Sequence, residues 1–266
     1  MRVVLVDSGL GSLSASSVLR EQRPDLDIVL AMDPEFMPWG SQTPQTVIDR
    51  ARHSVRAALA QWDDVAAVVL ACNTASVHAL PVLRSELEPQ IPVIGTVPAV
   101  KPAVAACRRV AVWATPVTAA SEYQRALVAE HARGANVTVM ACDGLAAAVE
   151  SAAHERVEAA VRHWAAQTPP DIEGLVLGST HYRLVEDLIA AALPEIRVFD
   201  SAEAVAGQLL RRAAGALGEP RVASGSVEVL AGGARSDFPA RALQYAQGRR
   251  LSPGGAATSN LSSSHR

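Results

Sequence analysis

Short runs of β-branched apolar residues alternate with longer, alanine-rich segments of helical period along most of this 266-residue chain. Such alternation is typical of βα units, in which each strand is followed by a helix that packs back onto a parallel sheet. The apolar runs are continuous, so we expect helices on both faces of each sheet. The chain is therefore predicted to be α/β, with strands at 3–6, 28–31, 67–71, 93–95, 109–113, 137–140, 174–177 and 197–199.

The segments between these runs predict the helices and one junction. Helices are expected at 44–61, 76–86, 119–131, 144–166, 184–192 and, after the capping segment Asp200-Ser201, at 202–216. The proline-bearing segment Gly95-Thr96-Val97-Pro98 follows the fourth run, and the strand–turn–helix series restarts at Arg109, so we expect a domain junction there. Small and polar residues dominate the C-terminus, which predicts a disordered tail over 251–266.

Composition excludes several classes of function. Lysine and arginine number 24 against 27 aspartates and glutamates, so no basic excess is available for nucleic acid. No apolar run approaches the ~20 residues that span a bilayer. Because the first residues lead directly into a strand-like run, we expect neither a signal peptide nor membrane association. The three cysteines fit no zinc-binding spacing, so we expect no metal and a cytoplasmic protein with reduced thiols.

Small polar residues follow or lie near the ends of predicted strands in four segments. These segments are Asp7-Ser8-Gly9, Pro38-Trp39-Gly40-Ser41, Cys72-Asn73-Thr74 and Ser179-Thr180-His181. In open α/β sheets, ligands bind beyond the carboxyl ends of the strands. Three of the segments open onto a predicted helix N-terminus, where free N–H groups favour a carboxylate. The sequence therefore predicts a site for a small acidic molecule.

Cys72 is the strongest candidate for a chemical role. It ends an apolar run and precedes Asn73-Thr74, which can cap the next helix. A thiol at a helix N-terminus has its thiolate stabilised, so we expect its pKa to fall toward neutrality. The alternative is a small buried cysteine, which suits Cys107 and Cys142 better.

His181 and Asp7 each allow a functional and a structural interpretation. His181 follows Ser179-Thr180 at a strand end, a position that suits a general acid or base, or a hydrogen-bonded surface histidine. A Ser179–His181 hydrolase lacks the expected G-x-S-x-G turn. The segment from Asp7 to Gly11 lacks the full GxGxxG pattern of nucleotide sites, and Asp7 would repel a phosphate, so a tight βα turn is the alternative.

The four segments, in this order, resemble the motifs of the cofactor-independent aspartate/glutamate racemase superfamily, and within it the glutamate racemases most closely. The strings that carry the resemblance are Asp7-Ser8-Gly9-Leu10-Gly11, Pro38-Trp39-Gly40-Ser41, Ala71-Cys72-Asn73-Thr74-Ala75-Ser76 and Leu177-Gly178-Ser179-Thr180-His181-Tyr182. Weaker matches lie at 115–121, 141–150 and 200–202, so only the tail falls outside the resemblance.

The resemblance implies two parallel-sheet α/β domains that face each other across an active-site cleft. The first domain would comprise 1–96 and 205–250, and the second 97–204. The implied reaction inverts the α-carbon of an acidic amino acid without a cofactor, which supplies a D-amino acid of the kind used as a peptidoglycan precursor. One thiol removes the α-proton, and a second thiol on the opposite face returns a proton. A homodimer acting on a small acidic amino acid or dicarboxylate is also implied.

Matching the motifs residue by residue assigns roles by resemblance. Cys72 would be the first thiol, assisted by Asp7, while His181 and Glu150 would assist on the other face, beside Ser179. The residues that would hold the substrate's charged groups are Ser8, Trp39, Gly40, Asn73, Thr74, Thr115, Thr118 and Thr180.

The sequence departs from the family at Ser179, which stands where the second cysteine is expected. An alkoxide forms far less readily than a thiolate, since free cysteine already titrates near pKa ~8.5. We expect Ser179 to donate a proton relayed from His181 but to be a poor base, which impairs racemisation in one direction. Two alternatives stay open: a one-cysteine lyase, such as a decarboxylase of a disubstituted malonate, and a non-catalytic homologue that binds an acidic ligand.

Overall fold

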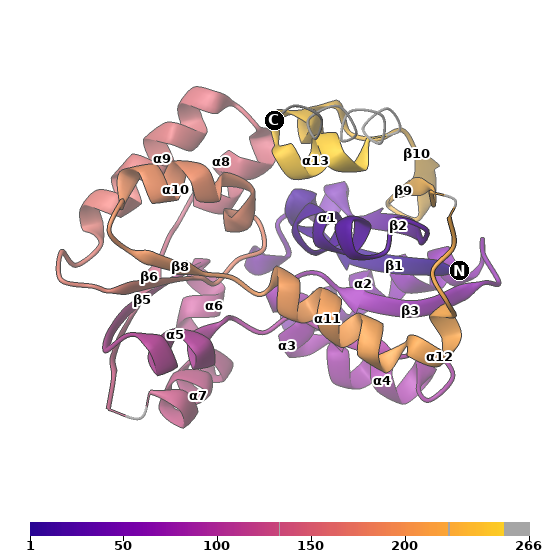
Figure 1. Ribbon diagram of the computed structural model, residues 1–266, viewed down its shortest axis with the longest axis horizontal. Coiled ribbons are helices and arrows are strands. Elements are labelled where there is room, and N and C mark those ends of the chain that lie inside the picture. The colour runs from indigo at the N-terminus through magenta and orange to yellow at the C-terminus, as the bar shows by residue number, and fades with distance from the viewer. Residues whose placement is uncertain (133, 223, 253–266) are drawn as a thin grey trace, which may run out of the picture.

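The computed structural model describes residues 1–132, 134–222 and 224–252, and it has two lobes, each built around its own sheet (Figure 1). The six-stranded sheet of the first lobe has the strand order β10-β9-β2-β1-β3-β4, and the four-stranded sheet of the second lobe has the order β6-β5-β7-β8. The strands of the first sheet are β1 (Arg2–Asp7), β2 (Asp27–Met32), β3 (Val65–Leu70), β4 (Val93–Gly95), β9 (Val227–Ala231) and β10 (Ala234–Ser236). Those of the second are β5 (Arg109–Ala114), β6 (Asn136–Ala141), β7 (Gly174–Leu177) and β8 (Arg197–Phe199).

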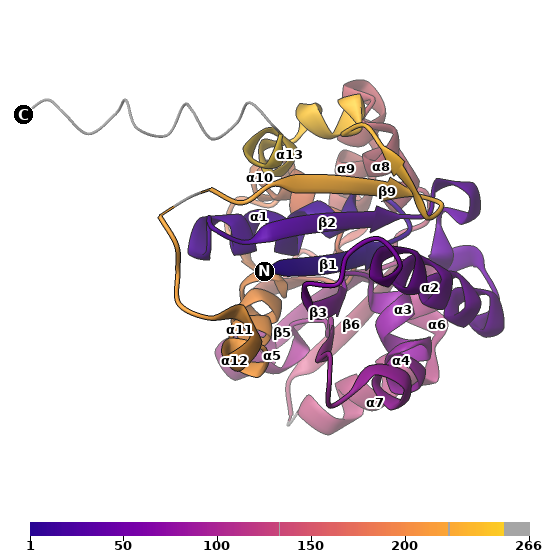
Figure 2. The same cartoon turned by 90° about the vertical axis from the view of Figure 1, so that its right-hand side faces the viewer.

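The sheets are parallel, as the sequence predicts, with one exception at an edge. β1 lies between β2 and β3 and pairs in parallel with both. Figure 2 shows β9, β2, β1 and β3 one above another. β9 and the antiparallel edge strand β10, which close this sheet, were not predicted. Glu228 interrupts the apolar residues of β9, and β10 is Ala-Arg-Ser, so neither strand is a continuous apolar run.

Helices cover both faces of the two sheets. Around the first sheet lie α1 (Leu13–Gln22), α2 (Pro44–Leu59), α3 (Asn73–His78), α4 (Leu80–Leu87), α11 (Ala202–Arg212), α12 (Ala214–Leu217) and α13 (Ala246–Leu251). Around the second lie α5 (Val100–Ala106), α6 (Pro116–Ala120), α7 (Glu122–His131), α8 (Leu145–Ser151), α9 (His154–Gln167) and α10 (Glu186–Ala192). Short 3₁₀ turns are η1 (Leu10–Ser12), η2 (Pro34–Phe36), η3 (Trp39–Ser41), η4 (Tyr182–Val185) and η5 (Ala240–Gln244).

The buried side chains confirm that the apolar strands are covered on both faces. In β1, Val3 and Leu5 join one apolar cluster, while Val4 and Val6 join another beneath α2. The cluster that contains Leu5 continues into the second lobe, where it includes Trp113 below α8. One apolar core therefore runs through both lobes.

Several predicted helices are divided in the structure. The predicted helix 76–86 is two helices, α3 and α4, because Pro81 lacks the N–H that would continue the first. The predicted helix 119–131 divides at Ser121, whose hydroxyl accepts the N–H of Gln124 at 3.0 Å and starts α7. The predicted helix 144–166 divides at Ala152, which has a left-handed backbone (φ 54°).

The C-terminal segment also differs from the prediction. Leu251 is buried and ends α13, so it belongs to the fold and not to the tail predicted from 251. The remainder of that tail, residues 253–266, lies outside the described residues. None of the helices described is both long and apolar enough to cross a membrane.

Candidate active site

A cavity of about 290 Å³ lies between the lobes, at the carboxyl ends of strands from both sheets. The first lobe contributes residues that follow β1 and β3, and the second lobe contributes residues that follow β5, β6 and β7. The predicted site residues that line it are Asp7, Ser8, Gly40, Cys72, Asn73, Thr74, Thr115, Thr118, Ser179, Thr180 and His181. This volume lies at the lower end of ligand pockets and suits a small molecule.

Cys72 follows β3 and occupies the position that precedes the first residue of α3. The N–H groups of Ala75 and Thr74 favour its thiolate, but burial and then the charge of Asp7 outweigh them. The pKa of Cys72 is consequently raised to about 12, so the predicted fall toward neutrality is wrong. The short helix does supply N–H groups, yet the same fold removes water and places a carboxylate beside the sulfur.

Asp7 is the last residue of β1 and is fully buried. Burial raises its pKa to about 6, against the lowering effects of the His181 charge and of the Gly9 N–H, which donates to Oδ1 at 2.9 Å. The Thr180 hydroxyl donates to Oδ2 at 3.2 Å. Asp7 is therefore a carboxyl group that can gain or lose a proton near neutral pH.

His181 and Glu150 form a buried pair beside the cavity. His181 Nε2 lies 2.9 Å from Glu150 Oε2, which also accepts the N–H of Leu10 from the first lobe at 2.7 Å. Burial alone would raise the pKa of Glu150, but the hydrogen bond and charge of His181, and then Leu10 and Arg241, lower it. Burial alone would lower the pKa of His181, but Glu150 and Asp7 raise it. Glu150 does not line the cavity but contacts His181, which does.

Two glycines allow this close approach of the lobes. A β carbon on Gly9 would overlap the Glu150 carboxylate. One on Gly11 would overlap both the Thr180 hydroxyl and the Asp7 carboxylate, and would come 2.9 Å from His181 Nδ1. The Asp-Ser-Gly-Leu-Gly segment therefore lacks side chains where carboxylates, hydroxyl and imidazole converge.

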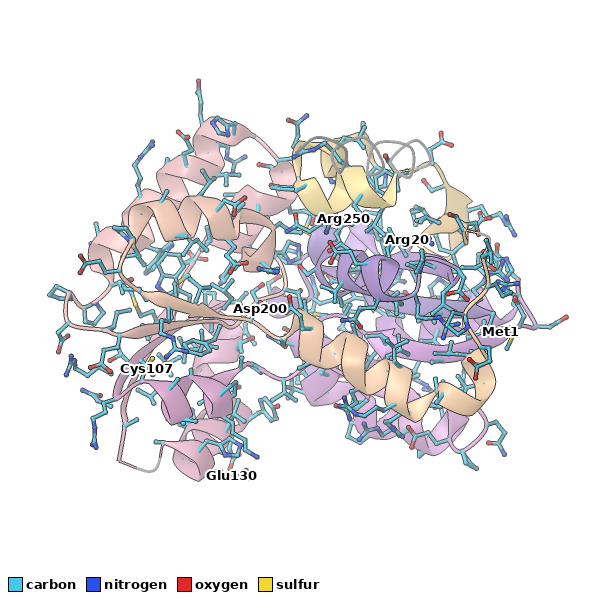
Figure 3. The ribbon with its side chains drawn as sticks, viewed as in Figure 1. Met1, Arg20, Cys107, Glu130, Asp200 and Arg250 are labelled. Carbon is cyan, nitrogen blue, oxygen red and sulfur yellow. The ribbon has the colours of Figure 1, made fainter. Side chains whose placement is uncertain are left out.

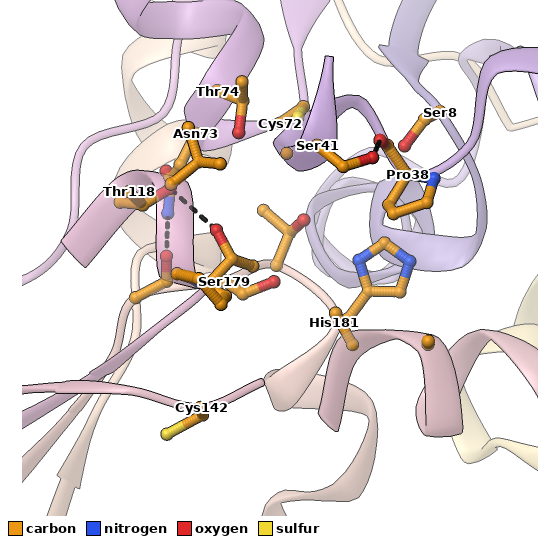
Figure 4. Close-up of a pocket in the computed structure, with 18 of the residues that line it drawn as sticks. Ser8, Pro38, Ser41, Cys72, Asn73, Thr74, Thr118, Cys142, Ser179 and His181 are labelled. Carbon is orange, nitrogen blue, oxygen red and sulfur yellow. Dashed lines mark hydrogen bonds between the residues drawn. The ribbon is translucent and has the colours of Figure 1, made fainter. Parts of the chain in front are cut away.

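Ser179 lies across the cavity from Cys72. Figure 4 shows Cys72 at the top of the cavity, with Ser179 and His181 below it. Asn73 joins the two sides, because its Nδ2 donates to the carbonyl of Gly178 at 2.6 Å. Its Oδ1 is buried and has no partner among the described residues, so it is free to accept a hydrogen bond from a ligand.

Three predicted substrate-binding threonines and one glycine line one end of the cavity. The hydroxyl of Thr115 donates to that of Thr118 at 3.0 Å. The hydroxyls of Thr115 and Thr74 lie 3.4 and 3.8 Å from the point where a β carbon on Gly40 would stand. This end therefore offers neutral hydrogen-bonding groups to an anion.

Trp39 is the predicted site residue whose side chain lies elsewhere. It is fully buried in the apolar cluster beneath α2, and its indole N–H donates to Asp33 at 2.9 Å. The side chain does not line the cavity, contrary to the sequence prediction. Trp39 sits in the turn η3, where its neighbours Pro38, Gly40 and Ser41 face the cavity while the indole packs inward.

Sequence reasoning missed Arg241, whose guanidinium binds Glu150 Oε1 through Nη2 at 2.8 Å and Nε at 3.2 Å. It lies in η5, far along the chain from every predicted strand, so no pattern indicated it. Within the described ranges, no three histidines, cysteines, aspartates or glutamates are grouped so that they could hold a metal ion.

Comparisons with known proteins point to one family. Residues 14–209 match the family model described as Asp/Glu/Hydantoin racemase. The glutamate racemase of Proteus mirabilis is 34% identical over 214 residues, which cover 77% of this chain and 73% of that protein. The glutamate racemase of Leptospira interrogans is 34% identical over 203 residues, covering 75% and 78%.

Solved structures of glutamate racemases are also similar to this chain. The Escherichia coli glutamate racemase, in complex with L-glutamate and an activator, matches with a TM-score of 0.77 and 27% identity over 91% of both chains. The Thermus thermophilus glutamate racemase matches with a TM-score of 0.69 and 30% identity, over 86% of this chain and 87% of that one.

Proposed function

The chain belongs to the Asp/Glu/hydantoin racemase family, and we propose that it inverts the α-carbon of an acidic amino acid such as glutamate, with Cys72 as the main base and acid. The observation that carries this proposal is the arrangement of the cavity walls. The first lobe contributes Cys72 and Asp7 to the cavity, and the second lobe contributes Ser179 and His181. A planar carbanion between them is open to proton transfer from either face.

The proposed reaction starts at Cys72. Its thiolate takes the α-proton, and the electron pair of the broken C–H bond is delocalised into the α-carboxylate. The N–H groups at the start of α3 and the neighbouring threonine hydroxyls favour that developing charge. The opposite face of the same carbon then receives a proton from the side of His181 and Ser179, which completes the inversion.

Substrate binding would also change the state of Cys72. Its raised pKa comes in part from the charge of Asp7. An ammonium group placed beside Asp7 and the free Asn73 Oδ1 would neutralise this charge, and the thiolate would form more readily. Without such a cation, burial and the charge of Asp7 favour the protonated thiol.

Ser179 should make the rates of racemisation in the two directions unequal. A serine hydroxyl can pass a proton on, but it is a poor base. We therefore propose that protons leave readily toward Cys72 and slowly toward Ser179.

Domain boundaries, assembly and location belong to the same proposal. We propose domains of 1–96 with 205–250 and of 97–204, a homodimer, and a cytoplasmic enzyme. The strands of the first sheet, which come from 2–95 and 227–236, support the discontinuous domain. Light scattering on the purified protein tests the dimer.

The test of the reaction is proton NMR in D₂O with each enantiomer of glutamate and aspartate. Wild type should exchange the α-proton, and Cys72→Ala should lower the rate by about 10³-fold or more. Cys107→Ala is the matched control, because Cys107 is buried in the second lobe away from the lobe boundary (Figure 3) and should leave the rate unchanged. Equal exchange in wild type and Cys72→Ala would refute the proposal.

A second candidate function is favoured by the single thiol of the Cys72–Ser179 pair. A lyase that removes carboxylate and returns one proton needs only one acid. Carbon dioxide released from a panel of disubstituted malonates, without exchange of glutamate, would support it. A rise in melting temperature with glutamate, but no exchange and no carbon dioxide, would indicate a protein that binds and does not catalyse.

A further inference from the structure

The carboxylate of Glu150 is surrounded by donors from three separate parts of the chain. Its side chain is 3% exposed and receives the Leu10 N–H, His181 Nε2 and the guanidinium of Arg241. Arg241 lies in η5, in the C-terminal segment that follows β10. The next contact along this segment is also with α8, because the Tyr245 hydroxyl donates to the carbonyl of Val149.

Arg241 supplies a second positive charge to the buried group formed by Asp7, Glu150 and His181. Asp7 and Glu150 both face His181, one from β1 and one from α8. One imidazolium cannot balance two buried carboxylates, and unbalanced buried charge is costly. Arg241 pairs with Glu150 on the side away from His181, since it binds Oε1 whereas His181 lies at Oε2.

We propose that Arg241 is a positioning residue for proton transfer on the Ser179 side of the cavity. It holds Glu150 in place and balances its charge, and Glu150 in turn fixes the orientation and protonation state of His181. The inference rests on the proposed function. Because Ser179 is a poor base, the imidazole beside it carries the proton on this side. When His181 acts as the acid, its N–H bond breaks and the proton forms a C–H bond with the electron pair of the carbanion.

The sign of the effect follows from the charges. Removal of Arg241 leaves Glu150 with an unbalanced negative charge, which further favours the imidazolium of His181. The pH at the midpoint of the His181 titration should therefore rise. The other groups near the pair are Asp7, which faces both His181 and Cys72, and Tyr245, which faces Glu150.

The experiment follows the imidazole C–H signals of His181 by NMR as a function of pH, without substrate, and His181→Gln assigns them. Arg241→Met should raise the midpoint by about one pH unit, and Arg241→Lys, which keeps the charge, should raise it less. Arg250→Met is the matched control, because Arg250 pairs with Glu21 on the exposed side of α13 (Figure 3) and should leave the midpoint unchanged.

A second background keeps the inference testable if Arg241→Met folds poorly. Glu150→Gln should lower the His181 midpoint, and adding Arg241→Met or Arg241→Lys to it should cause no further shift. A shift of the same size with and without the Glu150 carboxylate would overturn the proposed route through Glu150. An unchanged midpoint in both Arg241 variants would overturn the inference itself.

Exchange rates separate positioning from general loss of structure. The enantiomer whose proton leaves toward His181 needs a neutral imidazole, so its pH profile should move upward in Arg241→Met. The enantiomer whose proton leaves toward Cys72 should keep its profile. Equal loss for both enantiomers, with unmoved profiles, would mean a structural role only. The NMR titration needs no substrate, so failure of the racemase proposal would appear separately, as unchanged exchange in Cys72→Ala.

Discussion

The two walls of the cavity carry different groups, although the proposed reaction needs a proton transfer at each of them. The first lobe presents a thiol beside one buried carboxyl group, Cys72 with Asp7. The second presents a hydroxyl beside an imidazole that is held by a carboxylate and a guanidinium, namely Ser179, His181, Glu150 and Arg241. In the proposed reaction, the thiol becomes a base once a cation offsets the charge of Asp7, whereas the hydroxyl depends on the imidazole of His181. We infer from the difference that the wall with oxygen in place of sulfur needs more support from neighbouring charged groups.

Making the walls alike should have the largest effect. Ser179→Cys places a thiol on both sides and should raise α-proton exchange by about 10²-fold for the enantiomer whose proton faces the second lobe. Initial exchange rates in D₂O for each enantiomer measure this. Ser41→Cys, which adds a thiol to the first-lobe wall, should give no such gain. If Ser179→Cys exchanges the α-proton of neither enantiomer faster than wild type, the proposed difference between the two walls is wrong.

Removing the carboxyl group of the thiol wall should change stability in a way that depends on pH. Burial raises the pKa of Asp7 from 3.8 to about 6, so the folded state binds a proton that the unfolded state releases between these values. Stability therefore falls as the pH rises through this window, and Asp7→Asn should be more stable than wild type by about 2 kcal/mol at pH 7. Below pH ~4 the difference should vanish.

Urea unfolding at several pH values measures this difference. Asp25→Asn serves as a control of opposite sign, because the hydrogen bond from Arg23 holds the pKa of Asp25 below its usual range. That variant should be less stable than wild type at pH 7. Destabilisation by Asp7→Asn of the same size at every pH would contradict the buried-carboxyl interpretation.

The smallest effect on stability and activity is expected at Trp39, which is buried in the first lobe. Trp39→Phe removes the indole N–H that Asp33 accepts, while Arg50 still pairs with this carboxylate. We expect a loss of about 1 kcal/mol in the free energy of unfolding and unchanged glutamate exchange. Urea unfolding and the NMR assay measure the two quantities. A tenfold or greater loss of exchange in a folded variant would show that the indole matters to the site after all.

Much of the fold follows from local patterns. Eight strands are found where continuous apolar runs predict them, since such runs need cover on both faces. Helix divisions at Ser121 and Ala152 were missed because capping and backbone conformation depend on single residues within an otherwise helical period. β9 and the edge strand β10 were missed because neither is a continuous apolar run: Glu228 interrupts β9, and β10 contains Arg235 and Ser236.

Only those site residues that directly follow a predicted strand could be predicted from the sequence. Residues such as Cys72 and Ser179 follow apolar runs directly, and the cavity gathers them. The direction of the Cys72 pKa was not predictable, because it depends on burial and on a carboxylate far away in sequence. The role of Arg241 was not predictable for the same reason, because its partner Glu150 lies 91 positions earlier in the chain.

The apolar core that passes from Leu5 in the first lobe to Trp113 in the second has a consequence for how the protein comes apart. Cutting the chain into its lobes would expose the shared part of this core to water, so neither piece would keep its full stability. Unfolding should accordingly be one cooperative event. The contact between the lobes is thus part of what keeps each one folded.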